Sequence, residues 1–358
     1  MCRQRLDGRG GRPTGWLFLL SLIPLLLTAC GGGGSRGAAE HFALKTKNSE
    51  PVRITTGPDG QMWFTEFTAG RIGSTTPDGS IREFPVPTPR AGPYDIVTGP
   101  DRNLWFTEFA GDKIGRLSPQ GTFREFQLPN PRSGPYGVVV GPDQNLWFAE
   151  QRANAIGRLT PDGHLTEFPI PFATPPSPQP YGVTPGPDGN IWFTEEGSSK
   201  IGRLTTDGTL TEFPLPAPIS APEGITLGPD GNLWFTEHGT TRIGRITPAG
   251  VIHEFPLGKD SSPKNIVAAA DGNLWFTDLG TNKLGRITPA GTVTDFAVGS
   301  GYRQLEGIAG GVDGQVWFAE THANDIARVA LGRTMAAPKW SPWWRGSRPE
   351  SRPRDAGS

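Results

Sequence analysis

The stretch GPDGNLWFTE, residues 228–237, is one copy of a motif that the chain repeats seven times. Its tryptophan recurs at steps of 41 to 45 residues, at Trp63, Trp105, Trp147, Trp192, Trp234, Trp275 and Trp317. Each copy has an Asp four residues before the Trp and an acidic residue three residues after it. A period of about 40–45 residues is typical of β-propeller blades. The motif is therefore part of a scaffold, and function has to come from positions at which the copies differ.

The repeat from Pro222 to Pro256 shows how one blade is built. Four short runs rich in β-branched and aromatic residues are separated by Gly-containing turns, which predicts four antiparallel strands. No window has helical periodicity. The sequence therefore predicts an all-β fold, a seven-bladed β-propeller of four-stranded antiparallel blades over residues 39–334. We expect the Trp and the Ile of each IGR segment to pack between blades.

The last repeat is one strand short. DIARVAL, residues 325–331, supplies its third strand, but no run like TEFPLP follows. At the other end of the chain, EHFAL, residues 40–44, resembles HEFPL, residues 253–257, and precedes the first complete repeat. We expect this N-terminal strand to complete the seventh blade and to remove a free sheet edge.

The N-terminus resembles a bacterial lipoprotein signal peptide over residues 1–29. Four Arg precede an apolar run that is too short for a membrane-spanning helix of about 20 residues. The run ends in LTAC, residues 27–30, which resembles a lipobox and implies cleavage before Cys30 and acylation of its thiol. An ordinary secretory signal that ends in Cys is the alternative. Residues 30–38 are then a lipidated Cys with a flexible Gly-rich tether, which places the protein on the extracytoplasmic side of an envelope membrane.

Composition excludes several classes of function. A net charge of −1 with 19% charged residues gives no support to nucleic-acid binding. Cys2 leaves with the signal peptide, so the mature chain has no disulfide. No Cys/His metal spacing, Ser-His-Asp order or phosphate-binding loop is present. Residues 335–358 lose the period and predict a disordered tail rich in Pro, Arg and Ser, and we expect a monomer.

The copies differ at the start of the first strand, which in a propeller runs beside the central channel. We call this the opening position, and it is occupied in chain order by Val52, Tyr94, Tyr136, Tyr181, Glu223, Lys264 and Glu306. Three aromatic residues lie on one arc, and two acids flanking a lysine lie on the other. A concave axial site with convergent polar groups is a default ligand site. The alternatives are that the tyrosines only fill the channel and that the charges only balance one another.

Further polar residues are expected at the same end of the blades. The seven acids that follow the tryptophans, Glu66, Glu108, Glu150, Glu195, Glu237, Asp278 and Glu320, should gather at the mouth of the channel. Either each accepts backbone hydrogen bonds at a strand end, or some of them hold Mg²⁺ or Ca²⁺ through oxygen ligands. His238 and His322 follow second strands near this end, and as lone histidines they are expected to be solvated loop residues.

The segments GPYGV, GPDGNLWFTE, NKLGRITPAG and TEFPLP closely resemble the virginiamycin B lyase, or streptogramin lyase, family. The resemblance covers residues 40–333. It implies a seven-bladed propeller that linearises cyclic depsipeptide antibiotics by elimination at an ester, with Mg²⁺ as cofactor. Such chemistry needs a base with a pKa near working pH and a metal that polarises oxygens.

The chain departs from the family at the positions that matter for catalysis. The family's catalytic histidines correspond to Lys264 and Glu306, and of its metal-binding acids only Glu320 has an approximate counterpart, with Gln304 replacing another. We expect the acids beside Lys264 to keep its pKa normal or raised, which excludes it as a base. The sequence therefore favours a lipid-anchored propeller that binds a small molecule, peptide or envelope protein at the channel mouth. The alternative is a Mg²⁺-dependent lyase or hydrolase that opens an ester in a cyclic depsipeptide or related substrate.

Overall fold

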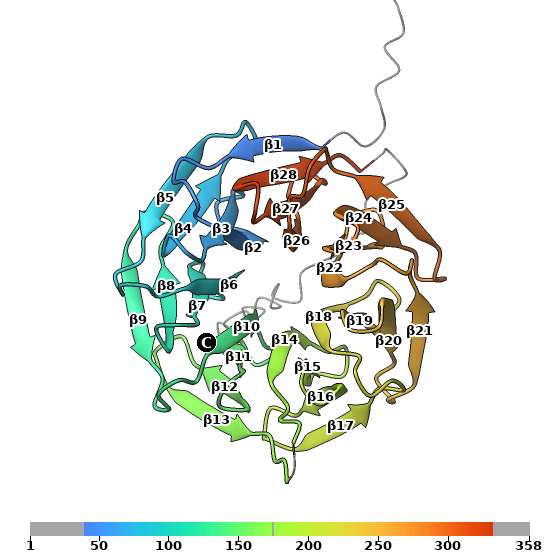
Figure 1. Ribbon diagram of the computed structural model, residues 1–358. Coiled ribbons are helices and arrows are strands. Elements are labelled where there is room, and N and C mark those ends of the chain that lie inside the picture. The colour runs from blue at the N-terminus through green and yellow to red at the C-terminus, as the bar shows by residue number, and fades with distance from the viewer. Residues whose placement is uncertain (1–38, 174, 332–358) are drawn as a thin grey trace, which may run out of the picture. The chain divides into compact units, whose positions relative to one another are not determined.

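The computed structural model describes residues 39–173 and 175–331 (Figure 1). The signal peptide, Cys30, the tether and the tail predicted from the sequence lie outside the described residues. Within the described residues, no helix is long and apolar enough to cross a membrane.

Residues 39–173 and 175–331 form seven antiparallel sheets of four strands each, arranged as blades around a central axis (Figure 1). The predicted seven-bladed β-propeller is therefore confirmed. Blades 1 to 7 are numbered in chain order by their inner strands, which are β2 (Pro51–Thr56), β6 (Pro93–Thr98), β10 (Pro135–Val140), β14 (Pro180–Pro185), β18 (Pro222–Leu227), β22 (Pro263–Ala268) and β26 (Leu305–Gly310).

The remaining strands follow outward in each blade. The second strands, which carry the tryptophans, are β3 (Met62–Glu66), β7 (Leu104–Glu108), β11 (Leu146–Glu150), β15 (Ile191–Glu195), β19 (Leu233–Glu237), β23 (Leu274–Asp278) and β27 (Val316–Glu320). The third strands are β4 (Arg71–Thr75), β8 (Lys113–Leu117), β12 (Ala155–Leu159), β16 (Lys200–Leu204), β20 (Arg242–Ile246), β24 (Lys283–Ile287) and β28 (Asp325–Val329). The outer strands are β5 (Ile81–Pro85), β9 (Phe123–Gln127), β13 (Leu165–Pro169), β17 (Leu210–Pro214), β21 (Ile252–Pro256), β25 (Val293–Ala297) and, in blade 7, β1 (Glu40–Ala43).

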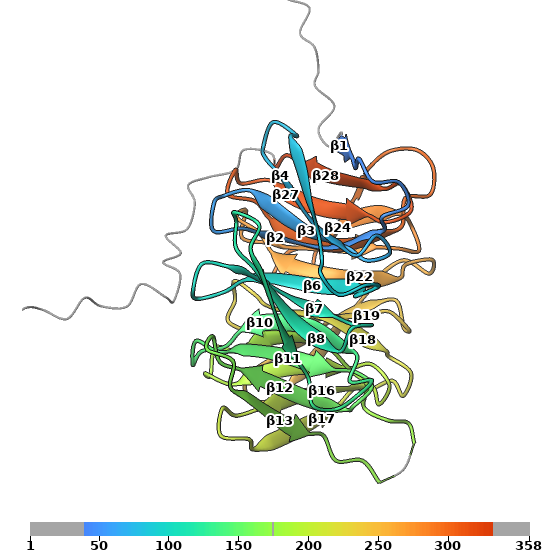
Figure 2. The same ribbon diagram turned by 90° about the vertical axis from the view of Figure 1, so that its left-hand side faces the viewer.

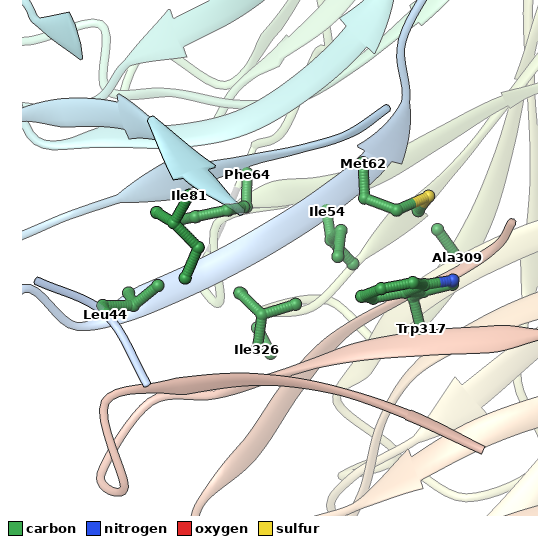
Figure 3. Close-up of a cluster of buried hydrophobic side chains, with 9 residues drawn as sticks. Leu44, Ile54, Met62, Phe64, Ile81, Ala309, Trp317 and Ile326 are labelled. Atoms are coloured by element: carbon green, nitrogen blue, oxygen red, sulfur yellow. The ribbon is translucent and has the colours of Figure 1, made fainter. Parts of the chain in front are cut away.

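The N-terminal strand closes the ring as predicted. β1 pairs antiparallel with β28 and forms the outer edge of blade 7 (Figures 1 and 2). Phe42 stacks on Trp317 with ring centroids 5.4 Å apart, as the outer-strand Phe stacks on the Trp in other blades. Next to this closure, Ile326 and Trp317 of blade 7 pack against Ile54 and Phe64 of blade 1 (Figure 3). Strands from both ends of the chain thus share one hydrophobic cluster.

The repeated motif residues form the layers between blades. All seven tryptophans are at most 2% exposed, and each packs with side chains of the following blade, as Trp234 does with Ile266 and Phe276. The Asp four residues earlier accepts a hydrogen bond from the indole N–H, with an N···O distance of 2.9 Å for Trp234 and Asp230. The Asp of the motif is therefore a turn residue that holds the tryptophan, and a scaffold role accounts for it.

A β-bulge near the start of each inner strand sets the position of the channel residues. In β18 the pairing with β19 is interrupted between Pro222 and Ile225. The Thr236 hydroxyl accepts the freed Gly224 N–H at 2.9 Å and donates to the Lys264 carbonyl of the next blade at 2.8 Å. The same pair of bonds is made by Thr65, Thr107, Thr194 and Thr277. In these blades, a Thr side chain therefore fixes the backbone carbonyl of the opening residue in the next blade.

Candidate functional site at the channel mouth

The opening positions lie together at one end of the seven inner strands, which surround the axis (Figure 1). We call this end the mouth and the opposite end, where the inner and second strands are joined by turns, the turn face. The structure brings the three tyrosines into mutual contact and joins Glu223 to Lys264. The two arcs predicted from the sequence are therefore adjacent walls of one mouth.

The tyrosines form the aromatic wall. The hydroxyls of Tyr94 and Tyr181 lie 2.5 Å apart, and the ring of Tyr136 lies 3.8 Å from that of Tyr94 and 4.3 Å from that of Tyr181 between centroids. Tyr94 and Tyr181 are buried, and burial raises the pKa of both phenols well above the usual value. These two tyrosines fill the channel, whereas Tyr136 is half-buried and remains accessible.

Two phenylalanines extend this wall and were not found from the sequence. Phe67 packs edge-on against Tyr94 at 6.2 Å, and Phe109 packs edge-on against Tyr136 at 5.2 Å. Both directly follow the acid at the end of a second strand. The signal was available, because the seven residues at this loop position differ as strongly as the opening residues do: Phe67, Phe109, Gln151, Glu196, His238, Leu279 and Thr321.

Arg53 was also missed, and it is the buried cation of the aromatic wall. Its guanidinium lies 5.2 Å from the Tyr94 ring and 5.8 Å from the Tyr181 ring, and the residue is only 7% exposed. Burial disfavours the charge, but Tyr94, Tyr181 and nearby acids outweigh burial and raise the pKa of Arg53. Its Nη1 has no hydrogen-bond partner among the described residues. The corresponding residue in four other blades is Gly, a contrast that could have identified Arg53.

Glu223 and Lys264 form the centre of the charged wall. Lys264 Nζ lies 2.8 Å from Glu223 Oε1, and Glu223 is 2% exposed. Burial opposes the charge of Lys264, but Glu223 and Glu306 outweigh it, so that the pKa of Lys264 is raised. The expectation of a normal or raised pKa is confirmed. Lys264 is a charged hydrogen-bond donor at the mouth.

His238 belongs to the same wall. Its Nδ1 lies 2.6 Å from Ser262 Oγ, and the side chain is half-buried. Burial and the charge of Lys264 lower the pKa of His238, against an opposing effect of Glu306. The expectation that His238 is a solvated loop residue is therefore wrong, because Ser262 and burial fix the ring. His238 is a neutral imidazole near two charged opening residues.

The acids after the tryptophans do not gather at the mouth, and that expectation is wrong. All seven are at most 3% exposed. Side chains alternate along a strand, so the last residue of the second strand points to the same blade face as its Phe, toward the preceding blade. Glu108 accordingly lies near Thr88 of the preceding loop and near Glu125 of the outer strand. Backbone hydrogen bonds, the simpler alternative, are seen at Asp278, which accepts three N–H groups.

Burial changes the protonation of these acids, because it outweighs the cations near them. Burial, helped by Glu125, raises the pKa of Glu108 to about 8. Burial is also the largest cause that raises the pKa of Glu66, Glu150 and Glu195 to about 7. Glu108 is therefore largely protonated at neutral pH and the other three acids are about half protonated, and all four belong to the blade interior.

Glu320, which the family resemblance suggests as a Mg²⁺ ligand, has a different environment from the other acids. Its Oε2 lies 2.7 Å from Arg303 Nη1 and 2.9 Å from His41 Nδ1, and Arg303 also lies 3.4 Å from Asp325. His41, Glu320 and Asp325 could in principle hold a cation. However, the Arg303 guanidinium already lies against both carboxylates, and Glu320 is fully buried. The residues around Glu320 do not fit Mg²⁺, and we derive no chemistry from a metal there.

Fold and site together define a class: a seven-bladed propeller whose scaffold repeats and whose axial mouth combines an aromatic wall with a charged wall. The virginiamycin B lyase family model matches residues 31–175 and 172–337. The chain belongs to this family.

Solved structures of family members are similar over nearly the whole propeller. A streptogramin B lyase structure is 39% identical, with a TM-score of 0.78, covering 82% of this chain and 97% of that one. Virginiamycin B lyase from Staphylococcus aureus is 38% identical with the same TM-score, covering 82% of this chain and 99% of that one. A catalytically inactive His-to-Ala variant of the Staphylococcus aureus enzyme, solved with quinupristin, is 37% identical, again with a TM-score of 0.78, and covers the same shares. No match was found among curated proteins.

Proposed function

We propose that this protein binds a small molecule or peptide at the channel mouth and that binding, not catalysis at the family's histidine positions, is its activity. The observation that carries the proposal is the pairing of Lys264 with Glu223 where a catalytic base would be needed. A lysine whose pKa is raised holds its proton and cannot abstract another at neutral pH.

The walls indicate what kind of ligand fits. Tyr136, Phe67 and Phe109 offer aromatic surface, which favours a ligand with a ring or a large apolar group. On the other wall, Lys264 has donor capacity beyond its bond to Glu223 and favours a carbonyl or carboxylate. Glu223 Oε2 is buried and has no hydrogen-bond partner among the described residues, so it can accept an N–H or O–H group that enters the charged wall. A peptide or depsipeptide with an aromatic side chain satisfies all three demands.

Quinupristin is the probe to use, because a similar protein has been solved with it. We expect calorimetry to detect binding to the wild type without turnover. Tyr136→Ala and Lys264→Met should each weaken binding about tenfold or more, since each removes one wall. Val251→Ala, on the turn face, is the matched control and should leave binding unchanged. Equal affinities for all four proteins would contradict a site at the mouth.

An ester-opening lyase is the second candidate, and His238 favours it. A neutral imidazole fixed by Ser262 is a better proton acceptor than Lys264. In this candidate it would take a proton from a carbon next to a carbonyl, a C=C double bond would form between that carbon and the adjacent carbon that bears the ester oxygen, and the C–O bond there would break to release a carboxylate. Incubation with a streptogramin B in the presence and absence of Mg²⁺, followed by mass spectrometry, separates the candidates. Turnover that His238→Gln abolishes would establish the lyase and overturn the binding proposal.

We further propose that the protein is held on the extracytoplasmic side of an envelope membrane by acylation of Cys30. The support is the LTAC segment and the Gly-rich residues after it. Two or more acyl chains anchor a protein stably, whereas an unmodified chain without a spanning helix is released. Cys30→Ser should therefore move the protein from the membrane fraction to the soluble fraction, and a variant that still sediments with membranes would disprove the anchor.

A further inference from the structure

Blade 1 lacks a side chain that the other six blades share. The fourth residue of the third strand, which pairs with the Trp of the second strand, is Arg in blades 2 to 7 and Ser74 in blade 1. The six arginines are Arg116, Arg158, Arg203, Arg245, Arg286 and Arg328.

These arginines fill the seams between blades near the turn face. Each guanidinium lies over the Trp ring of its own blade, at 5.0 to 5.9 Å from the centroid. Four of them form an ion pair with the motif Asp of their own blade, as Arg245 does with Asp230 at 3.7 Å. Four donate to a carbonyl in the outer turn of the next blade, as Arg245 does to Pro289 at 3.1 Å.

At the seam between blades 1 and 2, the turns that carry the corresponding acceptors line a pocket of about 320 Å³. We call it the seam pocket. It is lined by Pro58 and Asp59 of blade 1 and by Arg102, Asn103, Pro119 and Gln120 of blade 2. Asp59 is the motif Asp of blade 1, and Pro119 occupies the turn position of Pro289. The acceptors that hold a guanidinium in the other seams are therefore present, but the arginine is not.

Asp59 has no ion-pair partner among the described residues, although Arg102 lines the same pocket. Its Oδ1 accepts the Trp63 indole N–H at 3.0 Å and the Gln61 N–H at 3.1 Å, and the side chain is exposed. Arg102 donates to the Pro58 carbonyl at 3.4 Å, but among the described residues no ion pair forms at Asp59. The hydroxyl of Ser74, fully buried, also has no partner there.

We propose that the seam pocket binds a guanidinium group supplied by another arginine or by a guanidinium compound. The bound group would donate to Asp59 and to the Pro119 carbonyl, as the intrinsic arginines do in other seams. The bound group would not stack on the Trp63 indole as the intrinsic arginines stack on their own Trp rings, because Trp63 is already fully buried. The site is on the face opposite the mouth, so the proposal stands independently of the proposed function.

The guanidinium could come from the chain itself or from another molecule. β28 ends at Val329, which pairs with Val316 at the turn-face end of β27, so the chain leaves the propeller on the face of the pocket. Residues 332–358, which lie outside the described residues, contain five Arg. A tail of this length can reach a neighbouring blade, since extended chain spans about 3.3 Å per residue.

The Trp63 indole N–H, bonded to Asp59, reports on the pocket directly. We would label the Trp indoles with ¹⁵N and titrate the full-length protein with agmatine, using NaCl of equal ionic strength as the control. We expect a saturable shift of the Trp63 resonance while the six other motif indoles stay in place. Ser74→Arg should abolish this shift by filling the seam. An arginine fits at this position even when the paired residue of the outer strand is also Arg. In blade 2, Arg116 lies opposite Arg124, and in blade 1, Ser74 lies opposite Arg82 in the same register.

A gain of function provides the matched control. Arg245→Ser opens the equivalent seam at Asp230, and agmatine should then shift the Trp234 resonance as well. A variant with the five arginines of residues 332–358 replaced by Gln separates the two sources. If the tail is the occupant, this variant's Trp63 resonance differs from that of the wild type, and agmatine restores it. If the source is external, the two proteins respond alike. An unshifted Trp63 resonance in both, or a shift that survives Ser74→Arg, would overturn the proposal.

Discussion

The interior of the blades and the wall of the mouth follow opposite rules. In the interior, all seven copies keep the Trp and its Asp, and each Trp is at most 2% exposed. At the opening positions, no residue type is found in more than three blades. The interior is uniform because every seam is packed in the same way, whereas nothing in the packing requires the channel residues to agree. Repetition therefore identifies the scaffold of a propeller, and divergence identifies its site.

Removal of the strand that closes the ring should lower the stability of the protein more than any other change predicted here. Deletion of residues 39–45 removes β1, and with it the outer strand of blade 7 and the Phe42 ring over Trp317. We expect the free energy of unfolding to fall by several kcal/mol, because closure and inter-blade contacts are cooperative. Thermal unfolding followed by circular dichroism measures this. Glu40→Gln, at an exposed ion pair with Arg328, should cost less than about 1 kcal/mol. A deletion that melts at the wild-type temperature would contradict the role of β1.

The buried acids should make stability depend on pH. The pKa of Glu108 is about 8 in the folded protein and near the usual glutamate value in the unfolded chain. Because the folded state holds the proton more tightly, the stabilisation is fully present at about pH 4 and is lost as pH rises through about 8. Glu108→Gln should therefore be more stable than the wild type at pH 9, by about 4 to 5 kcal/mol, and within about 1 kcal/mol of it at pH 5.

The equivalent acid of blade 6 offers the control for this pH dependence. The Asp278 carboxylate accepts three backbone N–H groups, so Asp278→Asn should destabilise the protein at both pH values. Melting temperatures at pH 5, 7 and 9 distinguish the two substitutions. If Glu108→Gln lowered stability equally at pH 5 and pH 9, burial of a protonated acid would not be the cause.

At the mouth, the Glu223–Lys264 ion pair should contribute to the free energy of unfolding as well as to ligand binding. Lys264→Met leaves the buried Glu223 without its cation, and we expect a loss of about 2 kcal/mol at pH 8, smaller as the pH falls because burial raises the pKa of Glu223. Glu223→Gln in the same background should recover most of the loss. A double-mutant cycle by chemical denaturation measures the coupling between the two residues. Additive effects would show that the two side chains are independent.

The sequence predicted the scaffold well and the site only in part. Seven spaced tryptophans and the EHFAL segment were enough to predict the blades and the closing strand, because repeated local patterns specify repeated packing. Placement of the acids failed, since strand pairing brings their backbones near the mouth, whereas side-chain alternation turns them into the seams. Arg53 and Phe67 were missed because each is unusual only when compared with the same position in the other blades.

The smallest expected effect concerns the link between interior and mouth. In five blades a Thr hydroxyl accepts the N–H freed by the inner-strand bulge and donates to the backbone carbonyl of the next opening residue, as Thr194 does for Gly182 and Glu223. Blade 3 has Ala149 at this position, fully buried, next to the bulge between Pro135 and Val138. Ala149→Thr should supply both bonds, to Gly137 N–H and the Tyr181 carbonyl.

Each added hydrogen bond contributes about 1 kcal/mol at most, and ordering a buried Thr offsets part of the gain. We therefore expect Ala149→Thr to raise the free energy of unfolding by about 1 kcal/mol, measured by urea denaturation. Ala149→Val adds the same bulk without the hydroxyl, so it should be neutral or destabilising, and it separates hydrogen bonding from filling of space. If Ala149→Thr and Ala149→Val had the same effect on stability, the hydroxyl would not link the interior to the mouth, and the aromatic wall would be held by packing alone.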